Sequence, residues 1–82
     1  MSQVVVFSAD WCVYCKPIKT ALRRQGIRYR VMDVDTPAGS RLADRLRVRG
    51  IPAVFVLGDD DEYHRVTDPT PRRVRAALER HG

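Results

Sequence analysis

The 82 residues allow one domain with one modest core, and 44% hydrophobic and 30% charged residues are typical of a folded globule. The formal net charge is +5, yet no basic stretch is interleaved with aromatics as single-strand binding requires, so we expect no nucleic acid partner. No apolar run approaches the roughly 20 residues of a membrane span, and the first residues do not resemble a signal peptide. We therefore expect a single cytoplasmic domain over residues 1–82, monomeric and without a membrane partner.

The first half of the chain predicts a strand–helix–strand unit. Gln3–Phe7 is a continuous apolar run, typical of a strand buried on both faces, and the residues from Ser8 on should end it. A helix is expected to start near Cys12 and to end at Gly26, a residue suited to the left-handed conformation that follows many helices. Residues 28–34 then alternate as a second strand, which should run parallel to the first.

The second half predicts a helix, a hairpin and a final helix. Two Thr-Pro pairs, at 36–37 and 70–71, are helix-start signals because a hydroxyl cap precedes a proline in the first turn. Strands are expected over 53–57 and 62–66, with a turn at 58–61 between them. The order β-α-β-α-β-β-α indicates an α/β fold with a four-stranded mixed sheet flanked by three helices.

The two cysteines, Cys12 and Cys15, are too close in sequence to hold a fold together. They follow a predicted buried strand and lie at the N-terminus of the predicted helix. The helix dipole and the unpaired N–H groups there favour a thiolate, and Lys16 adds positive charge. We expect Cys12 to attack a substrate disulfide and Cys15 to resolve the mixed disulfide. The other interpretation is half of a zinc site, but one C-x-x-C supplies two of four ligands and His64 and His81 lack finger-like spacing. We favour redox chemistry and expect no metal.

Three segments carry a resemblance to a known family: Trp11-Cys-Val-Tyr-Cys15, Gly50-Ile-Pro52 before an apolar strand, and Val66-Thr-Asp68 before the last helix. Together they resemble a small thioredoxin-fold redoxin of the glutaredoxin family, over nearly the whole chain. Within that family the sequence is similar to mycoredoxins, through the Trp-Cys-x-Tyr-Cys motif, residues 19–22, residues 33–35 and residues 68–70. The resemblance implies a thioredoxin fold and a thiol–disulfide oxidoreductase that transports electrons in cell redox homeostasis. It implies no cofactor beyond the redox-active Cys12–Cys15 disulfide.

The resemblance also implies roles for single residues of the motif and the proline loop. Cys12 would be the exposed nucleophile and Cys15 the resolving cysteine. Pro52 would be a cis-proline that faces the disulfide, although an ordinary loop breaker is the other interpretation. Ile51, directly before it, would offer backbone hydrogen bonds to a bound substrate strand.

Four further residues have two interpretations each. Thr67 and Asp68 match the segment where glutaredoxins hold a low-molecular-weight thiol, but they equally suit a turn that leads to the next helix. Trp11 is expected either as a contact surface beside the sulfur or as a cover over the helix end. Tyr14 either flanks a bound thiol or packs on Ile18.

The sequence departs from the family patterns in ways that leave the electron source open. His64-Arg65 stand where glutaredoxins often have Gly-Gly, which puts glutathione binding in doubt, and Val6 replaces the buried Asp of thioredoxins. Thr67-Asp68 favour a low-molecular-weight thiol as electron source, whereas His64-Arg65 and Trp11 favour thioredoxin reductase. In the second case the protein would be a thioredoxin-like donor, for example to ribonucleotide reductase. The partners would be disulfide-containing proteins in both cases.

An alternative of another class is a non-catalytic module that binds a metal or an iron–sulfur cluster through Cys12.

Three other features of the sequence have simple structural interpretations. The acidic run at 59–62 is expected to be a solvated turn rather than a metal site. His64 is expected to be exposed and unspecialised. The arginines of the second helix and the loop after it indicate a solvent face in preference to a dock for an acidic partner; these are Arg41, Arg45, Arg47 and Arg49.

Overall fold

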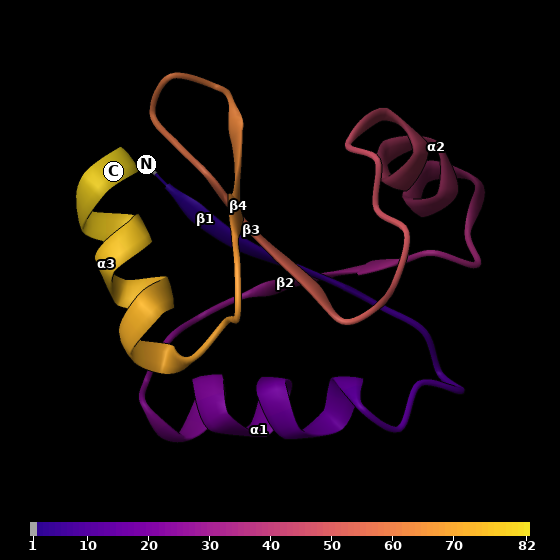
Figure 1. The fold of residues 1–82 in the computed structure, drawn as a ribbon, viewed down its shortest axis with the longest axis horizontal. Coiled ribbons are helices and arrows are strands. Elements are labelled where there is room, and N and C mark those ends of the chain that lie inside the picture. Colours follow the sequence, from indigo (N-terminus) through magenta and orange to yellow (C-terminus); the bar gives the residue numbers. More distant parts are fainter. Residues whose placement is uncertain (1) are drawn as a thin grey trace.

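A computed structural model describes residues 2–82 and shows one four-stranded sheet with helices on both faces (Figure 1). The strand order is β2-β1-β3-β4, with β2 parallel to β1 and the other two pairs antiparallel. The mixed four-stranded sheet and the parallel first pair are therefore confirmed. The elements in chain order are β1 (Gln3–Ser8), α1 (Cys15–Arg24), β2 (Arg30–Asp33), α2 (Pro37–Arg45), β3 (Ala53–Leu57), β4 (Tyr63–Val66) and α3 (Pro71–His81).

Several element boundaries differ from the sequence-based expectation; α1 ends at Arg24, two residues before Gly26, and β4 starts at Tyr63 rather than at residue 62. The first helix starts at Cys15 and not near Cys12, because residues 9–12 form a turn in which the Cys12 N–H donates to the Ala9 carbonyl at 3.0 Å. Ser8 belongs to β1, since the strand continues to pair with Asp33 of β2. The second strand spans only Arg30–Asp33, because only these four residues pair with β1, where their partners are residues 5–8.

The helix ends follow the local signals of the sequence. Gly26, just after α1, has a φ of 72°, the left-handed conformation that its lack of a side chain allows. The hydroxyl oxygens of Thr36 and Thr70 accept hydrogen bonds from the N–H groups of Gly39 and Arg73, as expected of N-caps. At Gly39 a Cβ would overlap the carbonyl oxygen of Asp33, so glycine lets the first turn of α2 approach the end of β2.

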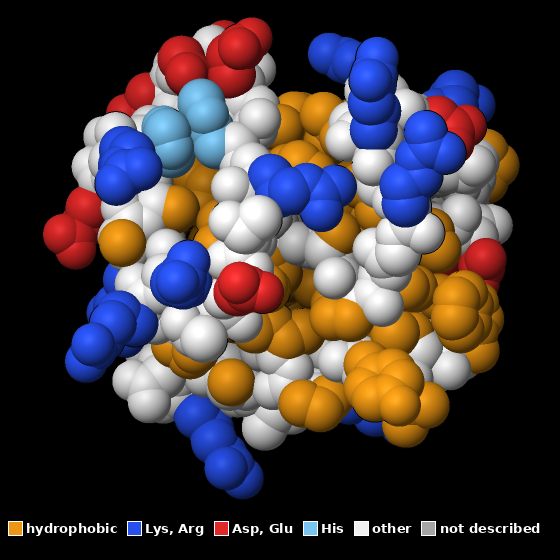
Figure 2. Space-filling model, viewed as in Figure 1, with side chains coloured by type: hydrophobic (Ala, Val, Ile, Leu, Met, Phe, Trp, Pro, Cys, Tyr) orange, Lys and Arg blue, Asp and Glu red, His pale blue; other side chains and the backbone are white. Residues whose placement is uncertain are grey.

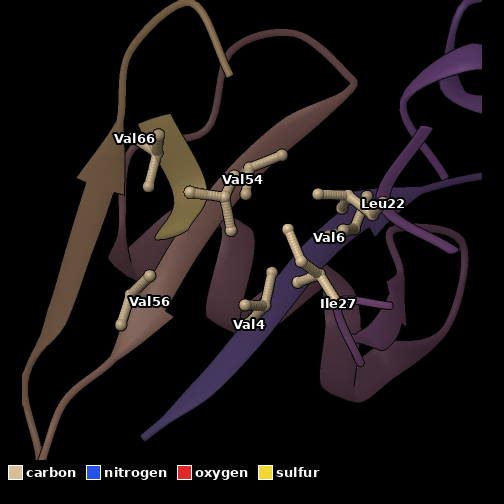
Figure 3. Packing of buried hydrophobic residues seen from close by; sticks show 8 residues of the cluster. Val4, Val6, Leu22, Ile27, Val54, Val56 and Val66 are labelled. Atoms are coloured by element: carbon tan, nitrogen blue, oxygen red, sulfur yellow. The ribbon is translucent and has the colours of Figure 1, made fainter. Parts of the chain in front are cut away.

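The continuous apolar strands are buried on both faces because α1 and α3 cover one face and α2 the other. Alternate residues of β1 and β3 contact Leu22 and Ile27 on the first face, which holds the larger core cluster (Figure 3). The strand residues of that cluster are Val4, Val6, Val54, Val56 and Val66. Phe7 and Phe55 lead the second cluster, with their rings edge to face at 5.5 Å. No helix within residues 2–82 is long and apolar enough to cross a membrane.

The two ends of the described chain lie together, beside α3 (Figure 1). Gly82 is so close to Ser2 that a Cβ on Gly82 would overlap the Ser2 hydroxyl oxygen. The turn between β3 and β4 joins the same region, because the Asp59 N–H donates to the His81 carbonyl at 3.1 Å. The last residues of α3 are thus held against the β3–β4 turn and the start of β1.

The expectation of an exposed, unspecialised His64 is wrong. Its side chain is 26% exposed, and its Nε2 lies 3.0 Å from Oδ2 of Asp60. Its ring stacks on that of His81, with centroids 3.6 Å apart and planes 3° apart, and Figure 2 shows the two imidazoles side by side. The sequence did not indicate this contact, because it depends on α3 ending against the hairpin. The acidic run at 59–62 is exposed, as expected of a solvated turn.

The Asp60 carboxylate should make the stability of the protein depend on pH in the acid range. The Glu62 N–H and the His64 ring hold the pKa of Asp60 below its usual value of 3.8. A carboxyl whose pKa is lower in the folded state contributes stability above the unfolded-state pKa and loses it as the pH falls through the folded value. Asp60→Asn should therefore flatten the loss of unfolding free energy below about pH 4 in denaturant titrations. Asp61→Asn, which removes neither hydrogen bond, is the control; equal flattening by both would contradict the assignment.

Candidate active site

Cys12 and Cys15 form a disulfide in the turn that joins β1 to α1, with their Cα atoms 5.4 Å apart. The turn is built from backbone hydrogen bonds: the Cys15 N–H donates to the Cys12 carbonyl and the Lys16 N–H to the Val13 carbonyl, each at 3.3 Å. Cys15 is the first residue of α1, and Cys12 lies one turn ahead of it. The sulfurs therefore sit at the positive end of the helix dipole, where a thiolate is favoured.

In this disulfide form Cys12 is not exposed, in contrast to what the resemblance implied. Cys12 is 5% exposed and Cys15 is fully buried. The cause is the cluster that the two residues form with Ala9, against which Val34 and Ile51 pack. The order of accessibility still agrees with the expected roles, because only Cys12 retains any exposed surface.

The loop before β3 lies directly against the outer cysteine. The peptide bond between Ile51 and Pro52 is cis, which is the geometry that the resemblance implied. The Ile51 carbonyl oxygen lies 3.9 Å from the Cys12 sulfur. This is a contact rather than a hydrogen bond here, since a disulfide sulfur carries no proton. The structure thus brings residues 12 and 51 together, 39 positions apart in sequence.

Three apolar side chains around the disulfide are exposed. Trp11 is 66%, Val13 70% and Tyr14 81% exposed, so Tyr14 contributes little to packing on Ile18. Figure 2 shows hydrophobic side chains gathered at the lower right of the molecule, the end at which Figure 1 draws the start of α1. We call Trp11, Val13 and Tyr14 the apolar rim; large exposed apolar side chains that cluster in this way are typical of binding surfaces.

Asp35 is a residue of this region that the sequence analysis missed. The Trp11 indole Nε1 donates to Asp35 Oδ2 at 2.8 Å, and the Asp35 N–H donates in turn to Asp33 Oδ1 at 2.8 Å. The signal was present in the sequence, because Asp35 follows the strand that pairs in parallel with β1. Residues after neighbouring parallel strands meet at one edge of a sheet. The bond ties the indole to the segment that follows β2.

Asp35→Ala should release the Trp11 indole without unfolding the protein. The lost hydrogen bond is solvent-exposed, so we expect a cost of no more than ~1 kcal/mol in unfolding free energy. Because Trp11 is the only tryptophan, its fluorescence should change in wavelength or anisotropy and report the release. Asp10→Ala, which removes an equal charge next to Trp11, is the control. Unchanged Trp11 fluorescence in Asp35→Ala would show that the bond does not hold the ring.

The other predicted site residues lie around this edge of the sheet. The register that pairs Val54 with Val66 carries Thr67 and Asp68 toward the Pro52 end of β3. Both are exposed, and Asp68 has a φ of 47°, a left-handed conformation that Asp tolerates better than most residues. Lys16 is exposed in the first turn of α1.

A cavity of about 280 Å³ opens next to the disulfide, between Trp11, the loop before Pro52 and α2. Its walls include Val34 and Ile51, which also pack on the cysteines, and it is bordered by the charged side chains of Asp44 and Arg49. Within residues 2–82, no three His, Cys, Asp or Glu side chains are grouped so as to hold a metal ion. The arrangement has the parts for thiol–disulfide exchange: two sulfurs of unequal accessibility, a helix N-terminus and an adjacent contact surface.

Comparison with known proteins gives one family. The glutaredoxin family model matches residues 4–60. A glutaredoxin of Ricinus communis is 40% identical over 60 residues, which cover 67% of this chain and 59% of that protein. Glutaredoxin-C5 of Arabidopsis thaliana, a chloroplastic protein, is 39% identical over 61 residues, which cover 67% of this chain and 35% of that protein. The match thus spans less than two thirds of the length of these relatives.

Solved structures show the fold. Thioredoxin of Fasciola hepatica superposes with a TM-score of 0.74 at 22% identity, covering 99% of this chain and 81% of that one. Mitochondrial thioredoxin 3 of Saccharomyces cerevisiae, in its oxidised form, gives the same score and identity over 96% and 77% of the two chains. The predicted thioredoxin fold is therefore confirmed, with the βαβαββα order of elements.

Proposed function

The chain belongs to the glutaredoxin family, and from this we propose that it is a thiol–disulfide oxidoreductase that reduces disulfides through Cys12 and Cys15. The observation that carries the proposal is the disulfide between these residues at the N-terminus of α1. The protein would work in the cytoplasm, where thiols are kept reduced and such a pair can cycle.

The proposed reaction is a two-step exchange of sulfur bonds. The Cys12 thiolate attacks one sulfur of a substrate disulfide, which forms a mixed disulfide and releases the other sulfur as a thiolate. The Cys15 thiolate then attacks the Cys12 sulfur, which forms the intramolecular disulfide and releases the second substrate thiolate. The substrate gains two electrons and the enzyme loses them, and water supplies the two protons that the substrate thiols take up.

The unequal burial of the two cysteines supports their roles. Cys12 is the only one with exposed surface, so an incoming disulfide reaches it first. Cys15 is fully buried and one helical turn away, which suits an attack on the mixed disulfide from inside. The helix dipole and the charge of Lys16 favour the thiolate, the form that attacks. The cycle uses the two sulfurs themselves as the redox group and calls for no further cofactor.

We propose proteins with disulfides as the substrates. The apolar rim at residues 11, 13 and 14 offers an exposed surface to a partner chain, and aromatic side chains are common anchors in such contacts. The Ile51 backbone, next to the Cys12 sulfur, would bond to an extended segment of that partner. Pro52 and Trp11 would then border the bound segment on either side of the disulfide.

We propose a low-molecular-weight thiol, glutathione or mycothiol, as the electron source. Thr67 and Asp68 support this, because the register of β4 places them at the Pro52 end of the sheet. Thioredoxin reductase is the competing source, favoured by Trp11 and by His64-Arg65. The contact of His64 with Asp60 and His81 gives this residue a structural role, which weakens its value as a sign of thioredoxin-like reduction.

A paired kinetic assay tests the proposal. Disulfide reduction is followed with thioredoxin reductase and NADPH, and separately with glutathione or mycothiol, its reductase and NADPH. We expect turnover with a low-molecular-weight thiol; turnover with thioredoxin reductase alone would make the protein a thioredoxin-like donor. No turnover in either arm, with metal or colour in the purified protein, would instead indicate a binding module for a metal or an iron–sulfur cluster.

A further inference from the structure

A second cavity lies at the end of the sheet away from the disulfide. It has a volume of about 410 Å³ and opens between the start of β1, the connection from α1 to β2, and α3. Because Gln3 is the first residue of β1 and the cysteine turn follows its last residue, the strand separates the cavity from the redox centre. In Figure 1 this region is the side on which α3 and the chain ends lie.

The lining of this cavity combines positive charge with an apolar floor. Arg28, Arg30 and Arg75 come from three segments and border the same space, and no carboxylate of residues 2–82 is among its lining. Val4 and Ile27, both buried, and the half-buried Leu78 form the apolar part.

Two lining residues, Arg75 and Tyr29, make hydrogen bonds with residues outside the cavity. The Arg75 Nη2 donates to the carbonyl of Gln25, the residue before the Gly26 that lines the cavity. The Arg23 Nη1 lies 3.4 Å from the Tyr29 hydroxyl and orients the phenol at the other side. Among the described contacts, Arg28 and Arg30 have no ion pair, so their guanidinium groups retain their full donor capacity.

This combination identifies the chemistry of a ligand. A guanidinium presents a planar fork of donors that suits phosphate oxygens, and three of them match a dianion with three terminal oxygens better than a carboxylate with two. The apolar floor requires a nonpolar group next to the charge, and the volume falls within the range of small-molecule sites. We propose that this cavity binds a small organic phosphomonoester, with the phosphate on Arg28, Arg30 and Arg75 and the apolar group on Val4, Ile27 and Leu78.

The proposal is independent of the redox chemistry. None of the lining residues contacts the cysteine cluster, and the ligand takes no part in sulfur exchange. Loss of reductase activity in Cys12 variants would therefore leave binding in this cavity unchanged. Failure of one proposal says nothing about the other.

Titration of the protein with phenyl phosphate, followed by amide NMR shifts, tests the site. We expect saturable shifts confined to residues around the cavity, such as Gly26, Ile27 and Tyr29. Inorganic phosphate, which lacks the apolar group, and benzoate, which carries one negative charge, should each bind at least ~10-fold more weakly. Benzoate binding as tightly as phenyl phosphate would overturn the choice of a phosphomonoester.

A pair of charge-matched variants separates a site from general attraction. The double variant Arg28→Gln/Arg30→Gln should weaken phenyl phosphate at least ~10-fold, because it removes two of the three guanidinium groups. Arg41→Gln/Arg45→Gln lowers the net charge equally on exposed positions of α2 and should leave the affinity unchanged. Equal weakening by both pairs, shifts spread over the whole surface, or no saturation would overturn the proposal.

Discussion

Replacing Cys12 by serine should reduce disulfide reductase turnover to the background rate. A serine hydroxyl does not ionise near neutral pH and forms no disulfide, so neither the first attack nor the intramolecular product is available. The measurement is reduction of a protein disulfide at saturating electron donor, with the folded state of the variant checked by circular dichroism. Full reductase activity in Cys12→Ser would refute the mechanism.

Cys15→Ser is the matched variant and should behave differently. The first attack by Cys12 is still possible, but the mixed disulfide has no internal thiolate to resolve it. We expect a covalent adduct with a protein substrate, seen as an added mass that a reductant removes, and residual activity only on small mixed disulfides. Equal loss without any adduct would show that Cys12 is not the attacking sulfur.

Leu22→Ala should cause one of the largest stability losses of any single substitution. Leu22 is fully buried in α1 and belongs to the core cluster with Val6 and Ile27, which lie near it (Figure 3). Such a truncation removes transfer free energy and leaves a cavity, at a cost of about 2–5 kcal/mol. A chain of this length has a total stability of roughly 4–12 kcal/mol. The melting temperature should therefore fall by at least ~8 °C.

Leu22→Met provides the control for this prediction. It conserves volume and should cost less than about 1.5 kcal/mol, so the difference between the two variants isolates the cavity. Both are measured by urea denaturation with unchanged slope, which shows that the unfolding reaction is the same. If Leu22→Ala lost only ~0.8 kcal/mol of unfolding free energy, the value of a single buried CH₂, α1 would have to close over the gap.

Local signals predicted much of the fold. The apolar strands, the Thr-Pro caps and Gly26 each act through their own backbone or next neighbours, so the sequence alone locates them. The cysteine pair is equally local, because its spacing of three residues lets the sulfurs meet across one turn. These local features are sufficient to place the candidate site at the end of β1.

The features that were missed depend on contacts between distant segments. The burial of Cys12 results from packing with Val34 and Ile51, and the indole bond joins residues 24 positions apart. His64 gains its role from a helix that ends 17 residues later. Neither spacing nor composition predicts such long-range contacts. Asp35 is the exception, because residues that follow neighbouring parallel strands lie at the same edge of the sheet.

The adjacency of Ser2 and Gly82 has a practical consequence for joining this domain to other chains. Ser2 and Gly82 both lie beside α3, on the far side of β1 from the cysteines, so a chain joined at either residue would not lie over the cysteine turn. Because Ser2 and Gly82 nearly touch, a short linker between these two residues would close a ring at small cost in loop entropy. The domain is thus suited to cyclisation and to insertion, as a single unit, into a surface loop of another protein.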